Sequence, residues 1–313
     1  MSAPSSHSST APSNLLFKDA KGAPAPVFQG DNRARSLALL ATFLVERNVI
    51  SAMQLLNKDP SLALEFVDIP TAPGNPKKPT EFPLAALRHG CTPGYALAVA
   101  NGFDVNAKLE GGTTTLLDQA VARAASSAEG LADVSMLLAM GADPSSLEAA
   151  ALHAAAFSVK NDQGLGLVQM LLDAKANFTY SADCECPLAV IVRQVKWTPE
   201  NGPTMTKLMA RFVKAGVSLD RSTGFPKTSP LHKALGMQNV PAMLTLIRLG
   251  AKADASAFQG RDMLELLAEA KLDKHIPEFT AATMEAQLGK LAKDAPVVAK
   301  QAAGSSRGMR GSI

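Results

Sequence analysis

A short leucine-containing segment recurs along the chain at a nearly constant spacing, and this repeat constrains the fold more than any other feature. Successive copies lie 33, 35, 36, 43 and 33 residues apart. Units of this length cannot bury both faces of their helices alone, so they stack on their neighbours in an extended array. The chain is therefore predicted to be a repeat protein. The shared leucines are Leu84, Leu117, Leu152, Leu188, Leu231 and Leu264.

A second recurring element follows the first one in each unit. An amphipathic run, such as VSMLLAM at 134–140, leads into a turn that usually contains glycine. Glycine accepts the left-handed backbone with which helices often end. In the fourth unit Lys175 stands at this place, so that turn is predicted to be strained or to end differently. The turn glycines are Gly102, Gly141, Gly216 and Gly250.

The segments SPLHKA at 229–234 and RLGAKAD at 248–254 resemble the ankyrin family, whose units start near TPLHxA and leave through a GADVNA-like turn. The resemblance covers residues 36–285 and implies an all-α fold, an ankyrin-repeat solenoid of stacked helix-turn-helix units. Only His153 and His232 keep the histidine of TPLH. For these two side chains the resemblance implies a hydrogen bond to neighbouring backbone turns and no proton transfer.

The domain organisation follows from the repeat and from composition. Residues 1–35 are rich in Ser, Pro and Ala, and residues 294–313 end in AGSSRGMRGSI, so both are predicted to be disordered tails. Between them lies the array. Its units are expected near 36–69, 80–112, 113–147, 148–183, 184–226 and 227–260, with a C-terminal cap at 261–293.

Three consecutive units are longer than the others between the shared leucine and the turn. The extra residues are predicted to be loops at 122–133, 157–166 and 195–204, at the same place in each unit. Stacking should align them along one edge, and insertions at equivalent places often serve binding. Trp197, the one tryptophan, is expected either to anchor a partner or to pack on its own scaffold. The candidate partner-binding residues are Trp197, Glu200, Asn201, Lys160, Asn161, Asp162 and Glu129.

The segment 69–79 carries prolines at every third position, namely 70, 73, 76 and 79. This spacing permits a polyproline II ligand for a proline-reading domain. The other interpretation, a solvated loop between helices, is the one we favour from the sequence.

Several classes of function find no support in the sequence. The longest apolar stretch, residues 36–45, is too short for a membrane span, and no secretory signal opens the chain. A net charge of +3 without a dense basic stripe gives no nucleic-acid signature. Phosphate-loop, zinc-protease and nucleophile-elbow motifs do not occur. We therefore predict no enzyme, no cofactor and no metal, with Cys91, Cys184 and Cys186 structural or incidental.

Two functions remain open at this stage. The first is a cytoplasmic, monomeric interaction module or scaffold that binds a protein of unknown identity. The second is a bacterial effector that is translocated into a host cell without a classical signal peptide. Its motivation is the N-terminal segment, where six of the first thirteen residues are serine.

Overall fold

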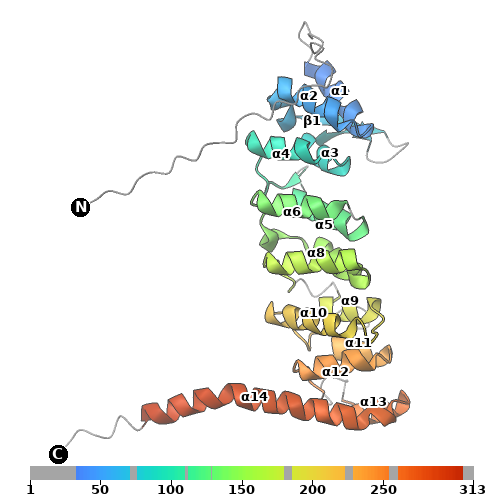
Figure 1. Ribbon diagram of the computed structural model, residues 1–313, viewed down its shortest axis with the longest axis vertical. Coiled ribbons are helices and arrows are strands. Elements are labelled where there is room, and N and C mark those ends of the chain that lie inside the picture. The colour runs from blue at the N-terminus through green and yellow to red at the C-terminus, as the bar shows by residue number, and fades with distance from the viewer. Residues whose placement is uncertain are drawn as a thin grey trace, which may run out of the picture. The chain divides into compact units, whose positions relative to one another are not determined.

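The computed structural model describes residues 33–70, 76–109, 112–127, 129–179, 185–222, 228–253 and 260–305, with side chains to Lys290 in the last helix. These residues divide into two compact units, residues 1–101 and 102–313. Both units consist mainly of short helices joined in antiparallel pairs (Figure 1). Of the predicted tails, 1–35 and 294–313, the segments 1–32 and 306–313 lie outside the described residues. Residues 33–35 and 294–305 are helical, which corrects the predicted tail boundaries.

The first unit contains two helix pairs and one β-hairpin. Its core is formed by side chains that are fully buried, among them Leu40, Leu56, Phe82 and Tyr95. The elements are α1 (Arg33–Val45), α2 (Val49–Lys58), the 3-10 helix η1 (Pro60–Leu64), β1 (Phe66–Pro70), β2 (Lys77–Glu81), α3 (Phe82–Arg88) and α4 (Thr92–Ala100).

The hairpin corrects the prediction for residues 69–79. Strands β1 and β2 pair in antiparallel register, with Ile69 opposite Lys78 and Asp68 opposite Pro79. Val67 and Ile69 are buried while Phe66 and Asp68 are exposed, the period-two pattern of a strand with one covered face. The described part of this segment is thus neither a loop nor a polyproline II helix. The segment 71–75, which includes the second proline of the series, lies outside the described residues.

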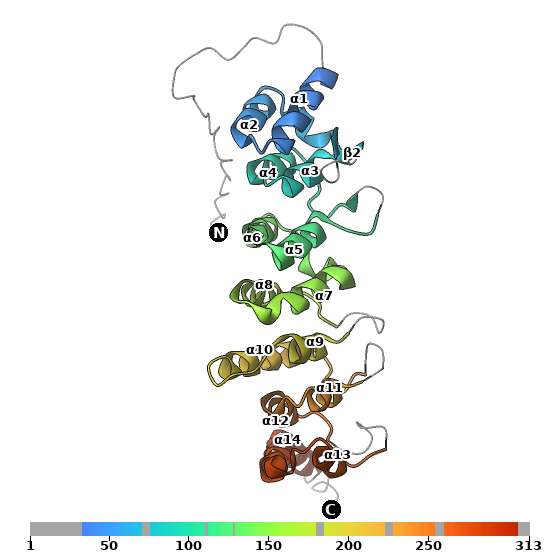
Figure 2. The same ribbon diagram turned by 90° about the vertical axis from the view of Figure 1, so that its right-hand side faces the viewer.

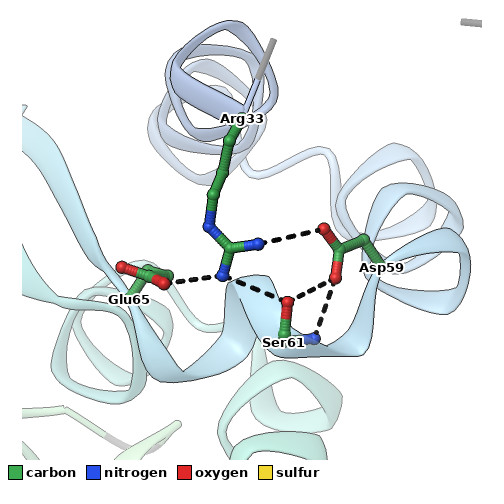
Figure 3. A network of polar contacts seen from close by, with 4 residues as sticks. All are labelled: Arg33, Asp59, Ser61 and Glu65. Atoms are coloured by element: carbon green, nitrogen blue, oxygen red, sulfur yellow. Dashed lines mark hydrogen bonds and ion pairs between the residues drawn. The ribbon is translucent and has the colours of Figure 1, made fainter. Parts of the chain in front are cut away.

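A polar network fastens the start of α1 to η1 (Figure 3). The Arg33 guanidinium donates to Glu65 Oε1 at 2.6 Å and to Ser61 Oγ at 3.1 Å. Asp59 caps η1 by accepting from the Ser61 backbone N–H at 3.1 Å, and it lies 3.6 Å from Arg33 Nη1. The network is open to solvent, so we assign it a role in orienting α1.

In the second unit the helices follow one another in five antiparallel pairs, each with a first and a second helix. Figure 2 shows the pairs stacked, so that the first helix of one pair lies beside the first helix of the next. Helix α5 contacts α7, α7 contacts α9, and α9 contacts α11, while the second helices contact one another in a parallel row. This is an ankyrin-like arrangement. The helices are α5 (Leu116–Ser126), α6 (Gly130–Ala139), α7 (Ala149–Phe157), α8 (Asp162–Asp173), α9 (Pro187–Gln194), α10 (Gly202–Lys214), α11 (Pro230–Gly236), α12 (Val240–Arg248), α13 (Met263–Glu269) and α14 (Ile276–Ser305), with short 3-10 helices at Pro144–Ser146, Ser158–Lys160 and Asp273–His275.

The second helix of each inner pair ends in the same hydrogen-bonded turn. After α10, Gly216 has φ +90°, and the next N–H, that of Val217, bonds to the Phe212 carbonyl at 3.0 Å. This pattern satisfies carbonyls that the helix end leaves without a partner. Lys175 adopts the same left-handed conformation with φ 64°, so the strain predicted for this turn is confirmed.

The shared leucines lie near the start of the first helix of each unit. Five of them are at most 2% exposed: Leu84, Leu117, Leu152, Leu188 and Leu231. Leu264 differs, because 45% of its surface is exposed, and Met263 and Leu267 are the buried side chains of α13. In an inner unit, the next helix pair covers the shared leucine. No described pair follows α13 and α14, so Leu264 stays exposed.

The last helix is longer than the sequence suggested. We predicted a helix at 277–293 and a tail from residue 294, but α14 continues through Pro296 to Ser305. The residues after this proline, VVAKQAA, include several good helix formers.

Candidate functional site

Much of the three predicted loops is helical in the structure, which corrects that part of the prediction. Residues 122–126 belong to α5 and residues 130–133 to α6. In the second insertion Phe157 ends α7, a 3-10 turn follows, and Asp162 begins α8. Alanine-rich segments such as 122–126 have high helix propensity, so the extra residues lengthen helices.

The third insertion does form a loop, Val195–Asn201, between α9 and α10. Asn201 holds it closed, because its Oδ1 accepts from the Thr198 N–H at 2.8 Å and its Nδ2 donates to the Lys196 carbonyl at 2.9 Å. Glu200 is exposed, and a hydrogen bond from the Thr198 side chain lowers the pKa of its carboxyl. The loop is therefore defined by internal hydrogen bonds.

Trp197 lies in this loop with its ring partly buried. Its indole Nε1 is enclosed and has no hydrogen-bond acceptor among the described residues. A buried donor without an acceptor is unfavourable, by about 1–3 kcal/mol. The burial favours contact with the scaffold, while the prediction that Trp197 anchors a partner stays a prediction.

Contacts between units bring the ends of the first helices together along one edge. Gln163 Nε2 of α8 donates to the Ala124 carbonyl near the end of α5 at 2.6 Å. The Arg193 guanidinium of α9 lies 5.6 Å from the centroid of the Phe157 ring of α7. Asn239, before α12, donates to the Val192 carbonyl at 3.5 Å. The ends of the first helices in four successive pairs are thus neighbours.

Phe157 is an exposed aromatic side chain on this edge, with 38% of its surface accessible. Lys160 Nζ and the Arg193 guanidinium each lie 5.6 Å from its ring centroid, within the range of a cation–π contact. Arg193 also pairs with Glu185 at 2.6 Å. We call Phe157, Lys160, Arg193 and the loop Val195–Asn201 the interhelical edge.

The other predicted site residues have mainly local roles. Asn161 caps α8 by accepting from the Gly164 N–H at 2.8 Å, and Asp162 is exposed in the first turn of that helix. Glu129 pairs with Arg123 at 3.2 Å, and Arg123 also pairs with the buried Asp133 at 2.8 Å.

Sequence reasoning missed Phe157 and Arg193. An aromatic residue three positions before a lysine at a helix end could have pointed to the pair Phe157–Lys160. The contact with Arg193 joins two units and has no local signature in the sequence.

Chemistry-bearing side chains do not gather elsewhere in the described residues. No group of three or more His, Cys, Asp and Glu side chains there has the arrangement of a metal site. Cys91 and Cys186 are buried thiols, and burial raises the pKa of both. Cys184 lies outside the described residues. No described helix is both long and apolar enough to cross a bilayer.

Comparison with known proteins finds similarity among solved structures. No protein-family model matches the chain, and no curated protein does. Among solved structures, the chain is similar to the human ASB11 ankyrin repeat domain, with 17% sequence identity and a TM-score of 0.49. The match covers 78% of this chain and 96% of that one.

Proposed function

We propose that the chain is a non-catalytic interaction module that binds a protein partner through the interhelical edge. The observation that carries this proposal is the exposed Phe157 ring between the cations of Lys160 and Arg193, at the place where successive helix pairs meet. Exposed aromatic residues beside arginine are the residue types that contribute most to protein interfaces.

The surroundings of Phe157 suit binding for two further reasons. Helix ends and a closed loop present the edge, so little conformational entropy is lost when a partner binds. Charges of both signs, Arg193 and Glu185 among them, surround the aromatic ring and can select a complementary partner. In this proposal Phe157 anchors the partner, and Trp197 holds the neighbouring loop in place.

Affinity capture with the full chain tests the proposal. Wild type is compared with Phe157→Asp and with a control, Met136→Asp, on α6, whose side chain is 41% exposed against 38% for Phe157. We expect wild type and the control to retain the same protein, and Phe157→Asp to lose it, with unchanged circular dichroism for all three. If Phe157→Asp retains the same proteins as wild type, binding does not use this edge.

A further inference from the structure

A groove of about 670 Å³ lies between the C-terminal ends of α8 and α10, away from Phe157. Leu172, Ala176 and Ala215 supply apolar lining, and Lys175, Arg211 and Lys214 supply three cations. Asp173 also lines the groove and forms an ion pair with Arg211. The groove therefore combines apolar surface with an excess of positive charge.

Helix α10 extends this positive charge along its surface. Lys207, Arg211 and Lys214 are spaced by four and three residues, which places them on one face of the helix. The helix Gly202–Lys214 contains no acidic residue. Arg211 also donates to the Gln169 carbonyl of α8 at 3.3 Å, so its position across the groove is fixed.

Among the cations that line the groove, Lys175 differs in its backbone, which is left-handed with φ 64°. The equivalent turns after α6, α10 and α12 use Gly141, Gly216 and Gly250. Glycine is the residue best suited to this conformation, so a lysine here is less stable than a glycine. Arg47, Gln238 and Lys271 also adopt left-handed conformations, so the backbone alone does not set Lys175 apart. What sets it apart is its place in the groove, where it adds a cation to the lining.

We propose that this groove binds an acidic peptide segment of the protein partner. Carboxylates of the peptide pair with Lys175 and Lys214, and apolar side chains of the peptide contact Leu172 and Ala215. The inference rests on the proposed function, since it assumes a protein partner, but it concerns a separate surface. The inference predicts that the protein partner contains a segment rich in Asp or Glu.

The charges of the chain argue against its own terminal segments as occupants. Residues 1–35 carry four basic and two acidic side chains, and residues 286–313 carry five basic and one acidic. Both segments are repelled by a positive groove. A nucleic acid fits less well than a peptide, because the cations are few and the carboxylate of Asp173 stands among them.

The test measures fluorescence anisotropy of a labelled twelve-residue peptide of Glu, Leu and Gly with the full chain. The same peptide with Gln for Glu and a twelve-nucleotide single-stranded DNA serve as comparison probes. The variant Lys175→Gly removes the cation and relieves the strained turn. Its matched control is Lys271→Gly, which removes an exposed lysine with φ 58° from the turn after α13, outside the groove.

We expect the Glu peptide to bind more tightly than the Gln peptide and the DNA. Lys175→Gly should weaken binding of the Glu peptide about fivefold, the ratio that corresponds to about 1 kcal/mol for an exposed ion pair. The melting temperature of this variant should rise, so a loss of binding cannot be attributed to misfolding. Lys271→Gly should bind like wild type.

Three results would overturn the proposal: equal binding of the Glu and Gln peptides, equal binding by wild type and Lys175→Gly, or tighter binding of the DNA. Phe157→Asp is expected to bind the Glu peptide normally. Failure at the groove is therefore distinguishable from failure at the interhelical edge, which the capture experiment tests.

Discussion

At the scale of single residues, the carboxylate of Asp118 joins two successive units. Its Oδ2 accepts from the Thr115 N–H at 2.7 Å, and its Oδ1 accepts from the Glu148 N–H of the next unit at 2.7 Å. The side chain is 3% exposed. Asp118 follows the shared Leu117 as His232 follows Leu231, and its carboxylate bonds to the backbone of the neighbouring unit.

Replacing Asp118 with alanine should therefore destabilise the fold. The change removes a helix cap and leaves the buried N–H of Thr115 without its acceptor, so we expect a loss of about 2–3 kcal/mol in the free energy of unfolding. Urea denaturation measures it. Asp162→Ala, in the exposed first turn of α8, is the control and should change stability by less than about 0.5 kcal/mol. Equal midpoints for the two variants would contradict this role.

His232 makes stability depend on pH in the acidic range. Burial, and to a lesser extent the charge of Arg261, lowers the pKa of its imidazole below the usual 6.5. The unfolded chain then binds a proton more readily than the folded one, so this contribution is present above pH 6.5 and is lost as pH falls. We expect the denaturation midpoint of wild type to fall more between pH 7.5 and 5.0 than that of His232→Gln. Parallel declines would show that His232 does not contribute.

At the scale of helices, the first turn of each first helix contributes to the core only where another pair covers it. Leu231 and Leu264 follow their N-caps at the same position, yet Leu231 is 1% exposed and Leu264 is 45% exposed. The two leucines thus form a matched pair for mutation.

Leu231→Ala should lower the free energy of unfolding by about 2–5 kcal/mol, the range for a buried leucine that leaves a cavity. Leu264→Ala should change it by less than about 1 kcal/mol, because little apolar surface is lost. Chemical denaturation of both variants gives the comparison. A similar loss for both would mean that Leu264 is buried in solution.

Local sequence signals predicted the helix starts better than the connections. The Ser229 cap and Pro230 mark the start of α11, and glycine marks the end of α10 and α12. The number of residues between a shared leucine and the next turn is the same whether the extra residues form a loop or lengthen helices. For this reason segment 122–133 was wrongly predicted to be a loop. The hairpin was missed because the prolines obscured the alternation of Val67 and Ile69.

At the scale of the whole molecule, the period of the repeat determined the predicted fold class because each unit carries the same caps and apolar positions. The candidate site was predictable only in part. Equivalent insertions indicated the edge, but the cluster of Phe157, Lys160 and Arg193 depends on packing between units. The groove beside Lys175 likewise joins two helix ends that lie far apart in the sequence.

Hydrogen exchange of the intact chain, with and without the captured partner, tests the central claim most directly. The account predicts that the partner slows exchange at residues 157–161 and 193–201, the described segments that form the interhelical edge. Unchanged exchange in both segments, with protection confined to other parts of the chain, would contradict binding through this edge.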